Sequence, residues 1–388
     1  MTPRRLVVLG TLAGDPYAGM AWMHMQIAVG LLRLGHDVYY MGATSAWPYD
    51  PLRQAKVCDS DYAVPYLARV AESFGLGGRW GYRRSYSDKA WFGLSQAKAE
   101  DLLAHADAVL NVAGATYPSR EGLQVGRLVH FGTDPVYHEL MYAKGGDDAR
   151  TFIEEHSDFV TYGENIGRPD CPIPPLPRLR SRTRQPVLLD LWQSGPPSRQ
   201  EFTTVCNWKQ SGHDVEYQGE VYYWSKHREF LKFIDLPRRL GQPIELATGF
   251  ANLPPDDRRM LESHGWRLVN AHAFTTDPWV YREYIRASRG EFTVAKDQNV
   301  RLRSGWFSER DACYLAASRP VIAQDTGFGN VLPTGEGLFA FNTMEEIVAA
   351  FDAIHSDYEK HSRAARRIAE EYFRAETVLA KVIDDLGL

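Results

Sequence analysis

The sequence of 388 residues contains four cysteines, and no two of them form a C-x-x-C pair. This scatter argues against a zinc site or a disulfide framework and favours reduced thiols. No apolar run approaches the roughly 18 residues that a membrane-spanning helix needs. The apolar segment at the start of the chain is interrupted by Gly10 and Gly14, which favours a strand and turn over a signal peptide. The sequence therefore predicts a cytoplasmic protein without a membrane span.

An excess of positive charge is also missing, because 44 Lys and Arg residues face 49 Asp and Glu residues, for a net charge of -5. This balance gives no sign of a nucleic-acid partner. No acidic D-x-D cluster follows a predicted strand, so no metal site is expected. The glycines at positions 10, 14 and 19 do not fit the dinucleotide fingerprint G-x-G-x-x-G. We therefore expect no metal and no bound cofactor.

Short apolar runs alternate with helical patterns along the chain, from RLVVLG at residues 5–10 to RPVIAQD at residues 319–325. This alternation predicts mostly parallel sheets with helices on both faces. Six prolines favour an extended, semi-rigid linker at residues 168–186. The expected fold is therefore α/β, with two doubly wound, Rossmann-like domains facing a cleft, at residues 1–167 and 187–355.

The C-terminal part of the chain has a strong helical signal. Thr343 and Glu346 have the spacing of a capping box, which predicts a helix that runs to about Ile354. Residues 356–388 continue in a charged helical pattern. These helices either cover the second domain or cross back to the first.

The first loop of the chain leads into an amphipathic pattern. Apolar residues recur at spacings of three and four, which predicts one buried helical face; they are Met20, Met23, Ile27, Leu31 and Leu34. The helix should begin near Gly19, with its free N–H groups directed into the cleft.

Two stretches resemble known enzymes. The helix end LLRLGHDV at residues 31–38 and the stretch ASRPVIAQDTG at residues 317–327 resemble elements of the GT-B glycosyltransferases. The resemblance implies an acceptor-binding first domain and a second domain that binds a nucleotide sugar, with dTDP- or UDP-sugars as the expected donors. It also implies metal-independent transfer of the sugar to a hydroxyl of a small-molecule acceptor, such as a specialised metabolite. A sugar-nucleotide epimerase of the same fold and a non-catalytic, two-lobed nucleotide-sugar-binding protein are the alternatives.

The sequence departs from the retaining members of these families at one point. Those members carry two glutamates eight residues apart on the helix before the proline of the motif. Alignment on Pro320 places Gly305 and Cys313 at the two positions. Glu309 lies between them, and we count it among the donor-binding candidates without assigning it the role of either glutamate.

Three basic residues are candidates for binding the donor's diphosphate. Lys226 begins a helical pattern, Lys296 ends a predicted strand, and Arg310 lies in the first turn of a predicted helix. Basic side chains and helix N–H groups can stabilise a leaving diphosphate without a metal. The planar guanidinium of Arg310 could bind two phosphate oxygens at once.

The stretch around Arg310 predicts two turns that meet at the cleft. Ser308 is a candidate N-cap, and Gly305 would allow the backbone to approach a ligand closely. A strand is expected at Val321–Ala323, and the residues that follow it leave the strand at its carboxyl end; they are Asp325, Thr326 and Gly327. We expect all of them to contact the donor.

Two carboxylates are candidates for the catalytic base. Asp134 follows the predicted strand RLVHFG at residues 127–132, and Asp15 precedes Pro16 in the first loop. Both would lie on first-domain loops that face the cleft. The simpler alternative is that each stabilises a turn.

Overall fold

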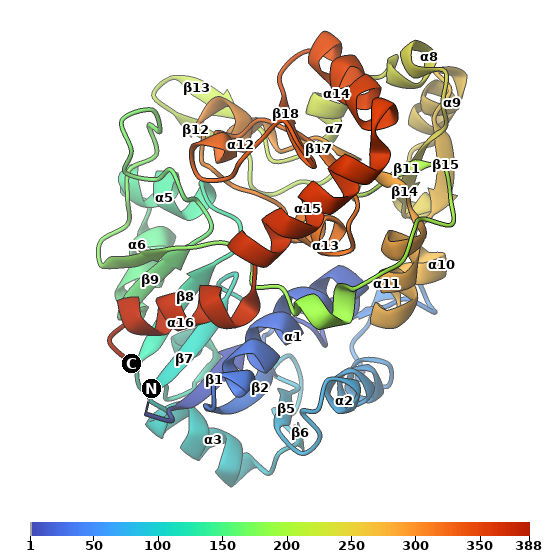
Figure 1. Cartoon of the computed structure of the whole chain (residues 1–388). Coiled ribbons are helices and arrows are strands. Elements are labelled where there is room, and N and C mark those ends of the chain that lie inside the picture. Colours follow the sequence, from blue (N-terminus) through green and yellow to red (C-terminus); the bar gives the residue numbers. More distant parts are fainter. Residues whose placement is uncertain (1) are drawn as a thin grey trace.

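The computed structural model describes residues 2–388, which contain two large sheets (Figure 1). The first sheet has eight strands in the order β10-β9-β8-β7-β1-β2-β5-β6, and only the pair β5–β6 is antiparallel. Its strands are β1 (Arg5–Leu9), β2 (Asp37–Ala43), β5 (Trp80–Arg83), β6 (Trp91–Gly93), β7 (Ala108–Val112), β8 (Leu128–Gly132), β9 (Asp158–Thr161) and β10 (Leu179–Arg182).

The second sheet has six strands, all parallel, in the order β15-β14-β11-β16-β17-β18 within the described chain. These strands are β11 (Phe202–Val205), β14 (Ile244–Thr248), β15 (Arg267–Asn270), β16 (Gly290–Thr293), β17 (Val321–Gln324) and β18 (Leu338–Phe341). Two small antiparallel hairpins are added, β3 (Tyr49–Asp50) with β4 (Ala55–Lys56) and β12 (Val215–Tyr217) with β13 (Glu220–Tyr222).

Both sheets are doubly wound, as the sequence predicted. In the first, the chain builds outward from β1 through β2 and β5, then returns to β7 on the other side of β1. In the second, it builds from β11 through β14 and β15, then returns to β16 on the other side of β11. Such points of reversal leave a crevice at the carboxyl ends of the strands, which is where ligands bind in folds of this type.

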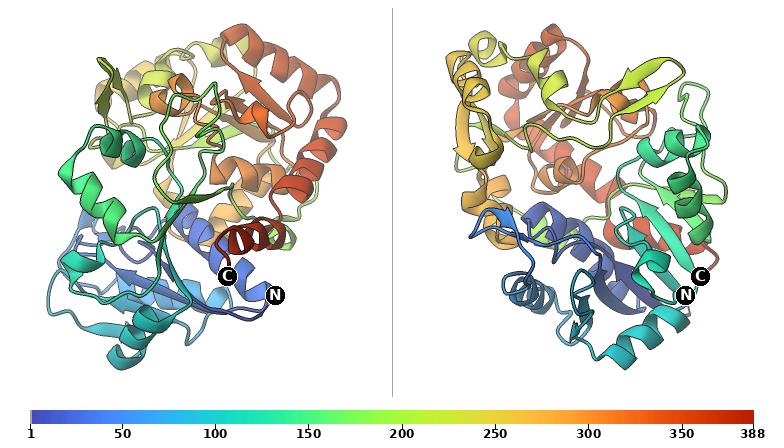
Figure 2. Two further views of the ribbon diagram at one scale, coloured as in Figure 1. Left: turned by 90° about the vertical axis from the view of Figure 1, so that its left-hand side faces the viewer. Right: turned by 180° about the vertical axis from the view of Figure 1, so that it is seen from behind.

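Helices surround the two sheets (Figure 2). Those of the first half are α1 (Ala18–Arg33), α2 (Ala63–Ser73), α3 (Gln96–His105), α4 (Pro118–Glu121), α5 (Tyr137–Ala143) and α6 (Asp147–Glu155). Those of the second half are α7 (His227–Leu231), α8 (Leu236–Leu240), α9 (Pro255–Ser263), α10 (His272–Thr275), α11 (Pro278–Ala287), α12 (Asp297–Arg301), α13 (Glu309–Ala316), α14 (Met344–Ser356), α15 (Tyr358–Tyr372) and α16 (Ala375–Asp385). The predicted capping box of Thr343 and Glu346 is confirmed at the start of α14.

The chain passes between the sheets in two segments that lie side by side. Part of the segment expected to be a linker is instead β10, an edge strand of the first sheet, where the nearby prolines are tolerated. Val187 then exchanges backbone hydrogen bonds with the segment that returns between α15 and α16, its N–H donating to Phe373 and its carbonyl accepting from Ala375. The last helix, α16, packs against α1 of the first half (Figures 1 and 2).

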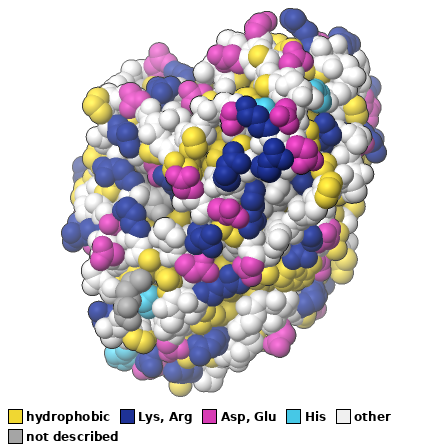
Figure 3. All heavy atoms as spheres, in the orientation of Figure 1, with side chains coloured by type: hydrophobic (Ala, Val, Ile, Leu, Met, Phe, Trp, Pro, Cys, Tyr) yellow, Lys and Arg dark blue, Asp and Glu magenta, His cyan; other side chains and the backbone are white. Residues whose placement is uncertain are grey.

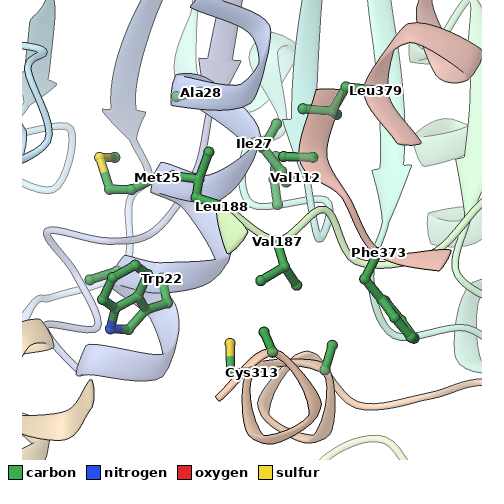
Figure 4. Packing of buried hydrophobic residues seen from close by; sticks show 14 of the residues in the cluster. Trp22, Met25, Ile27, Ala28, Val112, Val187, Leu188, Cys313, Phe373 and Leu379 are labelled. Carbon is green, nitrogen blue, oxygen red and sulfur yellow. The ribbon is translucent and has the colours of Figure 1, made fainter. Parts of the chain in front are cut away.

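A continuous apolar core joins the two halves (Figure 4). Trp22 and Ile27 of α1 pack in one cluster with Cys313 of α13 and Leu379 of α16. Helix α1 is therefore buried on nearly all sides, and the prediction of a single buried face was wrong. Met20 and Met23, expected in that face, are only partly buried.

The outer face of the molecule carries basic and acidic side chains interspersed (Figure 3). This mixture agrees with the nearly balanced charge of the sequence. Within residues 2–388, no helix combines the length and the apolar character that a membrane crossing requires.

Asn165, in the loop after β9, holds the two halves together at one point. Its side-chain Nδ2 donates to the carbonyls of Arg303 (3.1 Å) and Gly327 (2.9 Å). Its backbone N–H donates to the carbonyl of Ser304 at 3.1 Å. A Cβ on Gly305 would lie 2.7 Å from the backbone nitrogen of Asn165, and one on Gly327 would lie 2.4 Å from Nδ2. The expectation that Gly305 makes room for a ligand is corrected: both glycines make room for Asn165.

We expect Gly305→Ala to destabilise the protein. Gly305 has a φ of +77°, which an L-residue adopts at a cost, and the new Cβ would collide with the Asn165 backbone. The expected loss is at least about 1–3 kcal/mol, measured by chemical denaturation. Gly195→Ala is the matched control, because no atom lies within 4 Å of its Cβ position. Equal denaturation midpoints for the two variants would contradict this account.

Candidate active site

A cleft of about 950 Å³ lies between the two halves of the molecule. Its walls include the N-terminal turn of α1, the loop after β7, the end of β8 and the helices α5 and α6, all from the first half. The second half contributes Trp306 and the start of α13, together with residues beside the β12–β13 hairpin. The cleft is thus bordered by loops that follow the central strands of the first sheet, as the topology requires.

Several residues predicted for the site line this cleft, namely Gly19, Asp134, Ser308, Glu309 and Arg310. The side chain of Asp134 is 29% exposed. Gly19 lies in the first turn of α1, close to the expected start of that helix.

Asp134 forms an ion pair with Lys296, and this pair links the two halves across the cleft. Lys296 is the residue before α12, and its side chain is 7% exposed. Burial lowers the pKa of Lys296 to about 8, although the charge of Asp134 raises it. Oδ2 of Asp134 accepts the hydrogen bond from Lys296, whereas Oδ1 is buried without a partner among residues 2–388. One oxygen of this positioned carboxylate therefore has no hydrogen-bond partner within the described chain.

The three predicted cations lie close together in the structure. Burial and, next, the charge of Arg310 lower the pKa of Lys226, and the charge of Lys226 contributes to lowering that of Lys296. The Nζ atom of Lys226 lies 5.4 Å from the ring centroid of Trp306, which lines the cleft. Lys226 forms no ion pair and no side-chain hydrogen bond with any residue from 2 to 388. Of the three cations, Lys226 is therefore the one that is free, within the described chain, to bind an anionic ligand.

Arg310 is engaged with the protein instead. Its guanidinium pairs with the buried Glu291 and donates to the carbonyl of Val205 (2.6 Å) and to Oγ1 of Thr293 (2.8 Å). A fourth contact, at 3.4 Å, goes to Asp311. The guanidinium therefore cannot bind two phosphate oxygens in the way that the sequence suggested, because its N–H groups are already paired within the protein.

Ser308 begins α13 at the predicted position, with extended backbone angles. The predicted cap is absent, since the hydroxyl accepts no hydrogen bond from the helix backbone within the described chain. The hydroxyl and the first N–H groups of α13 are thus available to an anion in the cleft. Helix N-termini favour such anions through these N–H groups and the helix dipole.

Glu309 is held by the first half of the molecule. Its Oε1 accepts hydrogen bonds from Nε2 of Gln26 in α1 (3.0 Å) and from Sγ of Cys313 (3.1 Å). Burial raises the pKa of Glu309 to about 7. Tyr162 and Gln185 also line the cleft, and the Tyr162 hydroxyl and Gln185 Oε1 are buried without partners in residues 2–388.

The turn after β17 does not line the cleft and acts as a support. Thr326 donates from Oγ1 to the carbonyl of Trp306 at 2.5 Å, and its own carbonyl accepts from the N–H of Gly305 at 2.8 Å. Asp325 accepts a hydrogen bond at Oδ1 from the Gly327 N–H at 2.7 Å. The two predicted turns do meet, but Asp325, Thr326 and Gly327 position the Trp306 loop rather than line the cleft.

Asp15 lies outside the cleft walls. Burial raises its pKa, and a hydrogen bond with Thr11 opposes this effect. The structure therefore places it in a supported turn, as the alternative reading of the sequence held, and Asp134 is the carboxylate that borders the cleft.

Sequence reasoning missed a group of rings in the cleft wall. Phe152 and His138 stack with centroids 4.3 Å apart, and Tyr137 contacts His213 of the second half at 4.5 Å. The one sequence feature that could have pointed to these rings is that His138 lies close to Asp134 in the sequence. The contact between Tyr137 and His213 depends on how the two halves meet, which no local pattern encodes.

A metal site is not evident from the side chains. No group of three or more His, Cys, Asp or Glu residues in the range 2–388 is arranged to hold a metal ion. Whether turnover needs a metal is a separate question, and independence from metals stays a prediction.

Solved structures share this architecture. Anabaena HepE, in complex with UDP and glucose, superposes with a TM-score of 0.59 at 11% identity, covering 99% of both chains. A glycosyltransferase from Rickettsia africae gives a TM-score of 0.56 at 10% identity, over 99% of this chain and 98% of that one. AviGT4, a glycosyltransferase involved in avilamycin A biosynthesis, gives 0.50 at 12% identity, over 98% and 96%. The chain has the GT-B fold.

The fold prediction is therefore confirmed, on structural likeness alone. No protein-family model and no curated protein matches the sequence.

We expect Glu309→Gln to change how stability depends on pH. The pKa of Glu309 is raised by burial to about 7, so folding favours the protonated carboxyl. The free energy of unfolding of the parent should fall as the pH rises from about 4.5 to 7. That of the variant should not fall for this reason, because glutamine does not ionise. The variant's advantage should grow by on the order of 1–3 kcal/mol between pH 5 and pH 8. Chemical denaturation at several pH values measures it, and a pH-independent difference would count against the assignment.

Proposed function

We propose that this protein transfers a sugar from a nucleoside diphosphate sugar to a hydroxyl group of a small-molecule acceptor. The observation that carries the proposal is that the free N-terminus of α13 lines a GT-B cleft, while Lys226 lies against Trp306 and Lys296 against Asp134 of the cleft wall. A diphosphate has the charge and the oxygen atoms that such a site binds. That HepE was solved with UDP and with UDP-glucose supports a UDP-sugar as the donor.

Lys226 and the start of α13 would bind the diphosphate. Lys226 is the unpaired cation, and Ser308 offers a free hydroxyl beside the first N–H groups of the helix. As the bond between the sugar C1 and the diphosphate breaks, negative charge grows on the leaving oxygen. Fixed N–H dipoles and a cation stabilise that charge, which lowers the barrier. Because the protein supplies this positive charge, we include metal independence in the proposal.

Asp134 would act as the general base. Its unpartnered Oδ1 can accept the proton of the acceptor hydroxyl while the acceptor oxygen forms its bond to C1. Lys296 holds the other oxygen and orients the carboxylate. The ion pair thus places the base between the acceptor side and the donor side of the cleft.

The Asp134→Asn variant tests the function. With a labelled UDP-sugar, acceptor candidates and EDTA, the parent should form a glycoside, and kcat of the variant should fall about 10²- to 10⁴-fold. UDP should still bind, because Lys226 and the start of α13 remain to hold the diphosphate. A parent that converts the donor to an epimer without any acceptor would be an epimerase. A parent that binds the UDP-sugar but transforms it under no condition would be a binding protein.

Lys226→Met tests the diphosphate site. Loss of one charged hydrogen-bond donor should weaken UDP binding about 10- to 100-fold, while uridine binding should change little. Lys232→Met is the control, since Lys232 follows α7, which Lys226 precedes, and pairs with Glu229. Calorimetry measures both affinities. Unchanged UDP affinity in Lys226→Met, or an equal loss in the control, would remove Lys226 from the site.

A further inference from the structure

Five aromatic rings form a connected series along the cleft wall. Phe152 stacks on His138 (4.3 Å), His138 neighbours Tyr137 (5.7 Å), Tyr137 meets His213 (4.5 Å), and His213 meets Trp224 (4.6 Å). All five line the cleft. The Nζ of Lys296 lies over the ring of Trp224, so the series ends at the ion pair that holds Asp134. We call these five residues the ring series.

The wall around the ring series offers little hydrogen bonding. Met20, Met23 and Met141 add thioether surface to the cleft. The loop after β7 lines it too, but its backbone N–H groups at residues 113, 114 and 115 already donate to carbonyls of Phe131, Asn111 and Val112. An acceptor rich in hydroxyl groups would therefore find few hydrogen-bond partners here besides the polar atoms of the rings themselves.

The ring series also carries little charge. Burial lowers the pKa of His138 to about 4, and partial desolvation lowers the pKa of His213 as well, so both rings disfavour the charged form. Arg120 and Asp148, which border the cleft, pair with each other at 2.7 Å. An anionic acceptor would therefore meet no unpaired cation on this side among residues 2–388.

The unsatisfied polar atoms lie mainly elsewhere in the cleft. The Tyr162 hydroxyl and Gln185 Oε1 lie on the α13 side, since the charge of Glu309 acts on Tyr162 and Gln185 donates to the carbonyl of Phe307. Beside the ring series, His130 Nδ1 is buried without a partner in the described chain, with its ring 5.5 Å from that of His138. The cleft is thus polar where a donor sugar would lie, and the other side is aromatic, with His130 Nδ1 and Asp134 Oδ1 as isolated polar positions.

We propose that the ring series binds an uncharged, planar aromatic acceptor and presents its hydroxyl to Asp134. Flat rings stack on aromatic side chains, and thioethers add favourable contacts with their edges. His130 Nδ1 can make one hydrogen bond to a polar substituent of the ring. This assignment rests on the proposed transfer reaction for its role, but the binding itself can be measured without turnover.

Binding of three probes in the presence of saturating UDP tests the inference. The probes are 2-naphthol (an uncharged planar phenol), methyl glucoside (a neutral sugar) and glucose 6-phosphate (an anion). Calorimetry should show binding of 2-naphthol at least about tenfold tighter than of either sugar. Tighter binding of the glucoside or the phosphate would overturn the proposal.

Variants locate the binding on the ring series. Tyr137→Ala should weaken 2-naphthol binding about tenfold and leave UDP binding unchanged. Tyr39→Ala is the control, because Tyr39 of β2 packs against a core cluster that contains no member of the ring series, and it does not line the cleft. His213→Ala changes an exposed residue, should weaken binding in the same direction, and replaces Tyr137→Ala if that variant fails to fold. Parent-like affinity in His213→Ala and in a folded Tyr137→Ala would overturn the assignment.

The failure of this inference is distinguishable from that of the proposed function. If 2-naphthol binds through the ring series but receives no sugar from any donor, the binding site stands and the transfer reaction fails. If methyl glucoside is glycosylated and 2-naphthol does not bind, the transfer reaction stands and the aromatic acceptor is ruled out.

Discussion

The structure depends on one helix that belongs to the core of both domains. Helix α1 lies between the first sheet and the helices α11, α13 and α16, and apolar side chains leave it in nearly every direction. A helix that is apolar all round has to be buried all round. Gln26 satisfies the polar groups at this junction: its Oε1 accepts from the Leu188 N–H (3.0 Å) and from Trp192 Nε1 (3.1 Å), while its Nε2 donates to Glu309. The two domains therefore cannot separate here without exposing core side chains.

This shared core determines where the chemistry can occur. Because α1 packs on α13, the N-terminal turns of both helices open into the same cleft. Asn165 fastens the loop before α13 to the first domain, and the pair of Asp134 and Lys296 joins the opposite walls. Three contacts of different kinds, apolar, neutral polar and ionic, thus hold the cleft in one arrangement. Such preorganisation would spare the proposed transferase from ordering these groups at each turnover.

Local patterns predicted the features that depend on neighbours in the sequence. The strands, the doubly wound order and the helix starts at Ser308 and Thr343 follow from apolar runs and capping residues. Asp134 was found because carboxyl ends of parallel strands gather at one edge of a sheet. Gly305 was recognised as a position of close approach, but its partner could not be named, since Asn165 lies 140 positions earlier. Arg310 was misjudged for the same reason, because nothing near it in the sequence shows that Glu291 is buried beside it.

Two of the three cations near the proposed diphosphate site are paired with carboxylates, and within the described chain the third is not. Arg310 is balanced by Glu291 and Asp311, and Lys296 by Asp134, whereas Lys226 has no carboxylate within ion-pair distance in residues 2–388. A partly buried charge without a partner is unfavourable, and the neighbouring Arg310 adds repulsion. Such an arrangement costs stability in the empty protein, and a bound anion relieves it. The paired cations then fix the shape of the site, and the unpaired one supplies the attraction that a diphosphate would meet.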